Sequence, residues 1–125
     1  MLTIFSETIS IASFMVGFNQ SPYWDNPSKK GTSEIVKIND AYIWYKRGKT
    51  CMRISIDLIN KIYDYIIKNN LIGKKIFTKD LVDIKNNVSP KYTGWHNCDS
   101  TFIMMLARYV LGLPVSNKRP YFIIF

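Results

Sequence analysis

Residues 96–125 constrain the fold of this chain most, because they predict one helix with a definite end. Asn97 or Asp99 can cap its start, since a short side-chain oxygen accepts from amides that a helix leaves unpaired. Gly112 is typical of the left-handed residue that ends a helix, and Pro114 prevents the helix from resuming. The apolar residues recur three and four positions apart and form one stripe: Phe102, Met105, Leu106, Tyr109 and Val110.

A β-hairpin with a basic tip is predicted after this helix. Residues 121–125 are β-branched and aromatic, which favours a strand that returns against residues 113–115. The two runs are joined by Ser116-Asn117-Lys118-Arg119.

Two earlier segments also predict helices. Residues 55–70 have Ser55 as a candidate N-cap and an apolar stripe formed by Leu58, Ile59, Ile62, Tyr65 and Ile66. Residues 76–78 then favour a short extended link. Thr78 caps a short helix over residues 79–85, and residues 86–95 are predicted to form a loop.

The N-terminal part predicts a short helix, a loop and a pair of strands. Ser6 or Thr8 is a candidate start for an amphipathic helix that ends near Gly17. The loop over residues 19–33 contains Tyr23 and Trp24, which either fix the loop to the body or face a partner protein. Residues 34–47 favour two strands around Asn39-Asp40, followed by a basic turn over residues 46–49.

Three helices followed by a hairpin, with extended residues between the first two helices, resemble the winged helix-turn-helix fold. The resemblance covers about residues 50–125 and concerns architecture only. It implies an α+β fold, with a winged-helix-like three-helix core and a C-terminal β-hairpin wing. Residues 1–49 would add a helix and a β-hairpin as an appendage, in one compact unit with the rest of the chain. The third helix, residues 98–111, would be the recognition helix, and residues 116–119 the wing tip.

Charge is distributed unevenly along the chain. The formal net charge is +8, yet residues 1–45 carry a net of −1, whereas residues 46–125 carry fourteen Lys and Arg against five Asp, a net of +9. A basic segment favours a polyanionic partner, and DNA is favoured over RNA. The alternative is an undirected basic surface.

The predicted contacts with nucleic acid are basic residues in loops, in the wing and on the third helix, where long side chains can reach phosphates. They are Arg47, Lys49, Lys74, Lys75, Arg108, Lys118 and Arg119.

The third helix is unusually apolar for one that contacts bases, because its outward positions include Ile103 and Met104. Besides contact with DNA, three arrangements are open: these residues face a partner protein together with Tyr23 and Trp24, the N-terminal segment covers them, or they belong to the core. In the first case the chain would be a protein-binding module or an inhibitor of phage or mobile-element type. Such an inhibitor could dock onto a nucleoprotein such as a CRISPR effector.

Catalysis has one candidate motif. Asp83-Ile84-Lys85 has the (D/E)-x-K form of magnesium-dependent nucleases, with Asp64 upstream, but that chemistry requires adjacent strands. His96, Cys98 and Cys51 are too few for a closed zinc site, so we expect no metal, no cofactor and free thiols. The sequence therefore favours a non-enzymatic protein, with a homodimer on a symmetric site as one arrangement. Without a predicted membrane span or basic leader, we expect a cytoplasmic location.

Overall fold

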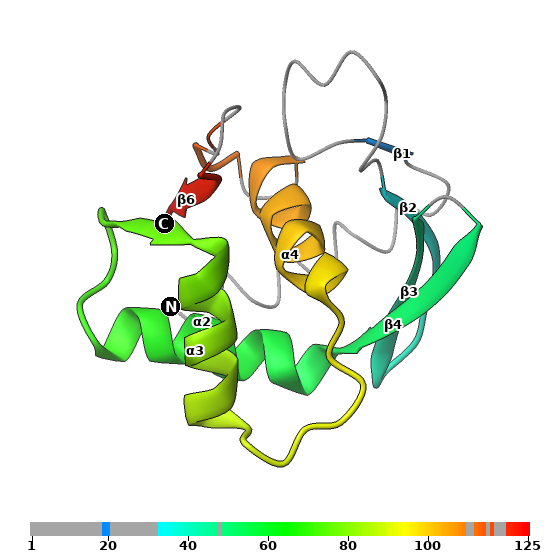
Figure 1. The fold of residues 1–125 in the computed structure, drawn as a ribbon, viewed down its shortest axis with the longest axis horizontal. Helices are drawn as coiled ribbons and strands as arrows, with labels where there is room; N and C mark the ends of the chain where they lie inside the picture. The colour runs from blue at the N-terminus through cyan, green and yellow to red at the C-terminus, as the bar shows by residue number, and fades with distance from the viewer. Residues whose placement is uncertain (1–18, 21–32, 48, 110–111, 115, 117–119) are drawn as a thin grey trace.

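Three helices and two antiparallel sheets form the part of the chain that the computed structural model describes, which is residues 19–20, 33–47, 49–109, 112–114, 116 and 120–125 (Figure 1). The predicted α+β class is therefore confirmed. The elements in chain order are β1 (Asn19–Gln20), β2 (Ser33–Ile38), β3 (Tyr42–Arg47), β4 (Thr50–Ser55), α2 (Ile56–Lys68), β5 (Lys75–Phe77), α3 (Thr78–Val88), α4 (Asn97–Tyr109) and β6 (Phe122–Ile124).

The larger sheet has the strand order β1-β2-β3-β4, and its predicted β2–β3 hairpin is confirmed. Asn39 forms the turn, because its side-chain oxygen accepts from the amides of Ala41 and Tyr42, both at 2.8 Å. Strand β4 was not predicted. It pairs with β3 over six residue pairs, from Tyr42 with Ser55 to Arg47 with Thr50. The predicted boundary between residues 49 and 50 therefore falls inside the β3–β4 hairpin.

Helix α2 confirms the strongest sequence prediction. The Ser55 hydroxyl accepts from the amide of Leu58 at 3.2 Å, as expected of an N-cap. Five apolar residues of its inner face are almost completely buried: Leu58, Ile59, Ile62, Tyr63 and Ile66.

The segment after α2 follows the predicted order with two differences. Residues 75–77 form β5, as expected, and α3 begins at Thr78. The carboxylate of Asp80, rather than the Thr78 side chain, accepts the amide of Phe77 at 2.8 Å. Helix α3 continues to Val88, three residues beyond the predicted end.

The chain after α4 forms the predicted return. Gly112 has a φ of 69°, the left-handed conformation that is common just after a helix, and the amide of Leu113 donates to the carbonyl of Ala107 at 3.0 Å. Ser116 donates to the Phe122 carbonyl at 2.8 Å, and Ile124 donates to the Pro114 carbonyl at 3.0 Å. Strand β6 therefore has a neighbour on each side. It hydrogen-bonds with Pro114 and Ser116 on one side and pairs with β5 on the other.

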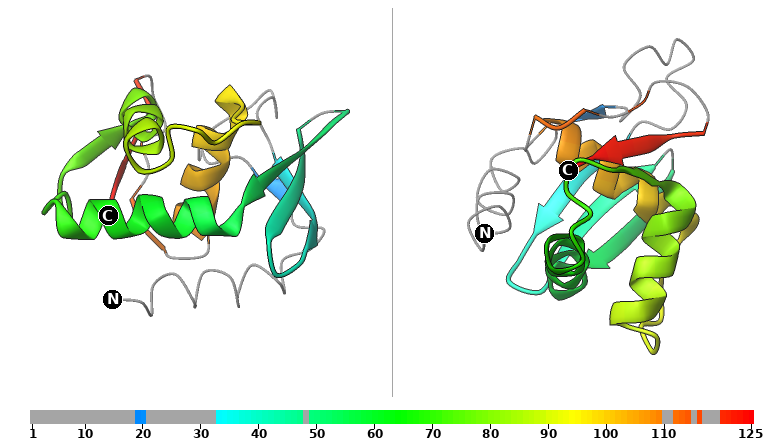
Figure 2. Two further views of the ribbon diagram at one scale, coloured as in Figure 1. Left: turned by 90° about the horizontal axis from the view of Figure 1, so that it is seen from below. Right: turned by 90° about the vertical axis from the view of Figure 1, so that its left-hand side faces the viewer.

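Helix α4 lies between the larger sheet and the part formed by α3, β5 and β6 (Figures 1 and 2). Its Phe102 ring stacks on the Tyr45 ring of β3, with centroids 4.0 Å apart and planes 4° apart. The inner face of the sheet contributes Ile35, Ile43, Tyr45, Met52 and Ile54 to the same core. Strand β3 thus covers the face of α4 that carries Phe102.

The expectation that Ile103 and Met104 form a protein interface is corrected, because both side chains have 0% exposure. Because α4 is apolar on several sides, these two residues of the helix lie in the core. Tyr23 and Trp24, the predicted N-terminal helix, and Lys118 and Arg119 at the wing tip lie outside the described residues.

Replacing Ile103 by Ala tests this burial. We expect the free energy of unfolding to fall by about 2–5 kcal/mol, because the change leaves a cavity in a packed core. The matched change at Ile72, which is 48% exposed, should cost less than about 1 kcal/mol. Urea denaturation measures both. Equal small losses would contradict the burial of α4.

Candidate functional site

The outer face of the larger sheet combines cations with aromatic rings. Lys37, Trp44 and Arg53 are cross-strand neighbours on β2, β3 and β4, so their side chains project to the same side of the sheet. Tyr42 lies two positions before Trp44 on β3, and Lys46 lies two positions after it, so both side chains project to that side as well. We call the set of Lys37, Tyr42, Trp44, Lys46 and Arg53 the basic-aromatic face.

The cations of this face lie over its rings. The Lys37 ammonium is 4.9 Å from the centre of the Trp44 ring, and the Arg53 guanidinium is 4.2 Å from the centre of the Tyr42 ring. The two rings are 5.7 Å apart and tilted by 56°. Such contacts hold long side chains in place by roughly 0.5–1 kcal/mol each at exposed sites. Glu34, opposite Lys46 in the register, is the acidic neighbour of the face.

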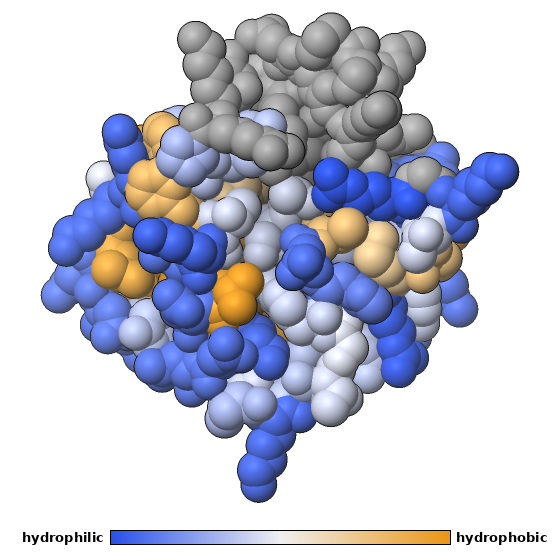
Figure 3. All heavy atoms as spheres, in the orientation of Figure 1, coloured by the Kyte–Doolittle hydropathy of each residue, from blue (hydrophilic) through white to orange (hydrophobic). Residues whose placement is uncertain are grey.

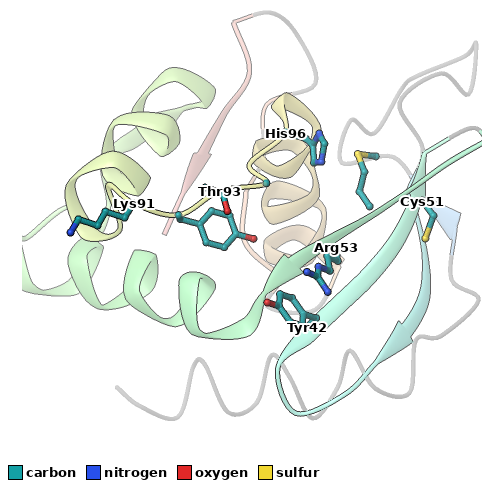
Figure 4. A pocket seen from close by; sticks show the side chains of 9 residues that line it. Tyr42, Cys51, Arg53, Lys91, Thr93 and His96 are labelled. Atoms are coloured by element: carbon teal, nitrogen blue, oxygen red, sulfur yellow. The ribbon is translucent and has the colours of Figure 1, made fainter.

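A groove of about 540 Å³ runs from this face to the loop before α4 (Figure 4). Tyr42, Cys51 and Arg53 reach it from the sheet, whereas Lys91, Thr93 and His96 reach it from the loop. The remaining lining residues are Met52, Tyr92 and Gly94, so none of the nine is acidic. The groove therefore suits a ligand with negative charge.

Tyr92 joins the two sides of the groove. Its hydroxyl accepts from the amide of Ser55, the last residue of β4, at 3.3 Å. Burial raises the pKa of the Tyr92 hydroxyl, which keeps it protonated. The ring also lies 5.8 Å from the ammonium of Lys85, which is 7% exposed.

A buried polar cluster fixes the sheet to the first turn of α4. Tyr45 donates its hydroxyl to one carboxylate oxygen of Asp99, and the other oxygen accepts from the His96 amide at 3.0 Å. The Arg47 guanidinium donates to the Thr101 hydroxyl at 2.6 Å. Asp99 is the third residue of α4, and its carboxylate caps the start of this helix. Its bond with Tyr45 also holds the sheet against the helix.

Burial determines the protonation of this pair. It raises the pKa of the Asp99 carboxyl above its ordinary value, although the bonds from the His96 amide and the Tyr45 hydroxyl lower it. Burial, followed by the charge of Asp99, raises the pKa of Tyr45, so the phenol keeps its proton.

The four predicted nucleic-acid contacts whose side chains are described do not meet in one patch. Lys49 is exposed at the β3–β4 turn, but Arg47 is half-buried and bonded to Thr101. Lys74 and Lys75 are exposed near β5, at the opposite end of the molecule from that turn (Figure 1). The Arg108 side chain lies outside the described part. Lys37, Arg53 and Lys91, which belong to the face or the groove, were not among the predicted contacts. Alternation along β4 could have identified Arg53, whereas the register shift before Lys37 interrupts the alternation of β2.

The nuclease motif does not have the geometry that it requires. Asp83 and Lys85 lie on helix α3 rather than on adjacent strands, and Asp64 lies on α2. Asp83 is exposed whereas Lys85 is buried, so the two side chains do not share a surface. Across the described ranges, no group of three or more His, Cys, Asp or Glu is placed to hold a metal ion. Cys51 and Cys98 are both free thiols, as predicted.

Comparisons with protein-family models, curated proteins and solved structures found no match. No helix among the described residues is both long and apolar enough to span a bilayer.

Asp99→Asn tests the buried pair through the pH dependence of stability. In the wild type, the folded chain binds the proton of the Asp99 carboxyl group more tightly than the unfolded chain does. The contribution of Asp99 to the free energy of unfolding is therefore expected to decrease as the pH rises from 3.8, the ordinary pKa of this carboxyl group, through its raised pKa in the folded chain.

The measurement is urea denaturation of both proteins across this range. The wild-type free energy of unfolding minus that of the variant should decrease with rising pH. A difference that increases with pH would contradict a raised pKa for Asp99.

Proposed function

We propose that this chain is a non-enzymatic nucleic-acid-binding protein on a winged-helix scaffold, and that it binds through the basic-aromatic face. The third helix of the scaffold is covered by the N-terminal strands. The proposed binding surface is therefore on the sheet that covers the helix and not on the helix itself.

The order of elements supports the scaffold. Helix α2 is followed by β5, α3 and α4, then by residues 114–116 and β6. The hydrogen bonds of Ser116 and Ile124 place β6 between residues 114–116 and β5, as in the three-stranded sheet of a winged helix.

The burial of α4 argues against base contact by its outer positions. Its residues Ser100, Phe102, Ile103, Met104, Leu106 and Ala107 are all buried. A helix that enters the major groove must present side chains to base edges. The same burial removes the surface on which protein binding through Ile103 and Met104 depended.

One observation carries the proposal: the row of Lys37, Trp44 and Arg53 across three strands, with both cations over aromatic rings. Cations on a sheet suit phosphates, and rings beside them suit stacking with bases. Lys46 on the same face and Lys49 at the adjoining turn are exposed and extend its charge.

Total charge alone would not identify this face. Hydrophilic side chains spread over the helices as well as over the sheet on the side of the molecule seen in Figure 3. Exposed lysines also occur on α2 and α3, at Lys68 and Lys79. What distinguishes the basic-aromatic face is that its cations are ordered beside rings.

The double variant Lys37→Ala/Lys46→Ala tests the proposal. We expect weaker binding of a labelled oligonucleotide, and a plot of log affinity against log salt that is shallower by about 1.4–1.8, because two phosphate contacts are lost. Fluorescence anisotropy at several salt concentrations measures both quantities.

The control is Lys68→Ala/Lys79→Ala, which removes the same charge from the helices. It should keep the wild-type slope. Equal losses in the two double variants would favour an undirected basic surface, and absence of binding at low salt would disprove the function.

A further inference from the structure

We propose that the groove beside β4 holds one nucleotide of a single-stranded nucleic acid, which continues onto the basic-aromatic face. This inference rests on the proposed function and assigns it a class of ligand. Tyr42 and Arg53 belong to both the face and the groove, so one continuous strand can contact both.

The groove has the size and charge for this ligand. Its volume of about 540 Å³ lies within the range of roughly 300–1,000 Å³ that is typical of small-molecule sites. Arg53 approaches from the sheet and His96 lies on the loop side, where Lys91 also lines the groove although its side chain extends toward α3 (Figure 4). The Arg53 cation, with no carboxylate in the lining, suits a phosphate group.

The edge of β4 adds backbone donors to the groove. Among the described strands, β4 pairs only with β3, so its other edge is unpaired. The Ser55 amide points to that edge, because it donates to Tyr92, whereas the next amide, that of Ile56, donates to Ala41 beside β3. Since successive amides of a strand alternate, those of Arg53 and Cys51 also point to the groove side. They can donate to phosphate or base oxygens.

The rings favour a single strand over a duplex. Tyr42 and Tyr92 both line the groove, and Trp44 adjoins Tyr42 on the sheet. Aromatic rings stack on bases that are exposed, as they are in single strands, whereas a duplex presents its backbone and groove edges. An occupant of this groove therefore needs an unpaired base.

Affinity for a single strand gives the first test. The variant Lys91→Ala/His96→Ala changes only the loop wall, and both side chains are exposed. We expect it to weaken binding of a dT15 oligonucleotide roughly tenfold, while a 15-base-pair duplex is affected much less. The control Lys79→Ala, on α3, should bind both like the wild type. Equal losses for strand and duplex, or no loss for either, would overturn the proposal.

Cys51 gives a second test, because this exposed thiol lines the groove. Alkylation by N-ethylmaleimide, followed by peptide mass spectrometry, measures its reaction rate, and Cys98 serves as the internal reference. We expect dT15, at a concentration that saturates only the wild type, to slow alkylation of Cys51 several-fold relative to Cys98, and to slow it less in Lys91→Ala/His96→Ala at that same concentration.

The outcomes separate the two proposals. Saturated dT15 binding without protection of Cys51 would overturn the groove assignment and leave the proposed function intact. No dT15 or duplex binding at low salt would overturn both. Equal protection by polyglutamate would overturn the nucleotide assignment in favour of an acidic peptide.

Discussion

The contact between β3 and α4 determines what this protein presents to a partner. Tyr45 stacks on Phe102 and donates to the buried Asp99, which also caps α4 through the His96 amide. A buried carboxylate is unfavourable unless it is hydrogen-bonded, so this geometry constrains the sheet and the helix together. With the sheet held there, the inner strand positions join the core and the outer ones remain exposed.

In this arrangement the sheet carries the proposed binding surface, and the third helix does not. In the winged-helix arrangement that we propose, α4 would contact DNA, yet Phe102, Ile103 and Met104 have 0% exposure. The sheet that covers α4 instead carries Lys37 and Arg53 over aromatic rings. Its free edge, together with the loop before α4, forms a groove without acidic residues. The same packing that hides the helix therefore creates the proposed binding surface.

Local signals were sufficient to predict the helices and the C-terminal return. Ser55 capped α2 as expected, and Gly112 ended α4 with positive φ, because both effects depend on a few neighbouring residues. Strand β4 was not predicted although Met52 and Ile54 alternate with Cys51 and Arg53, because this short run leads directly into α2 and is held as a strand by its pairing with β3.

The groove could not be predicted from the sequence, because Arg53 and Lys91 are distant in the chain and meet only in the fold. The burial of Ile103 and Met104 remained one of several alternatives for a related reason. An apolar helix face indicates that something covers it, but the periodicity does not say whether the cover is a partner or this chain's own strands.

The most direct test of the account is a backbone amide NMR titration of the full chain with dT15. The account predicts that the shifts concentrate in β2, β3 and β4 and in the loop around Lys91, while the amides of α4 beyond its first turn change little. Shifts concentrated along α4 with an unaffected sheet would contradict it.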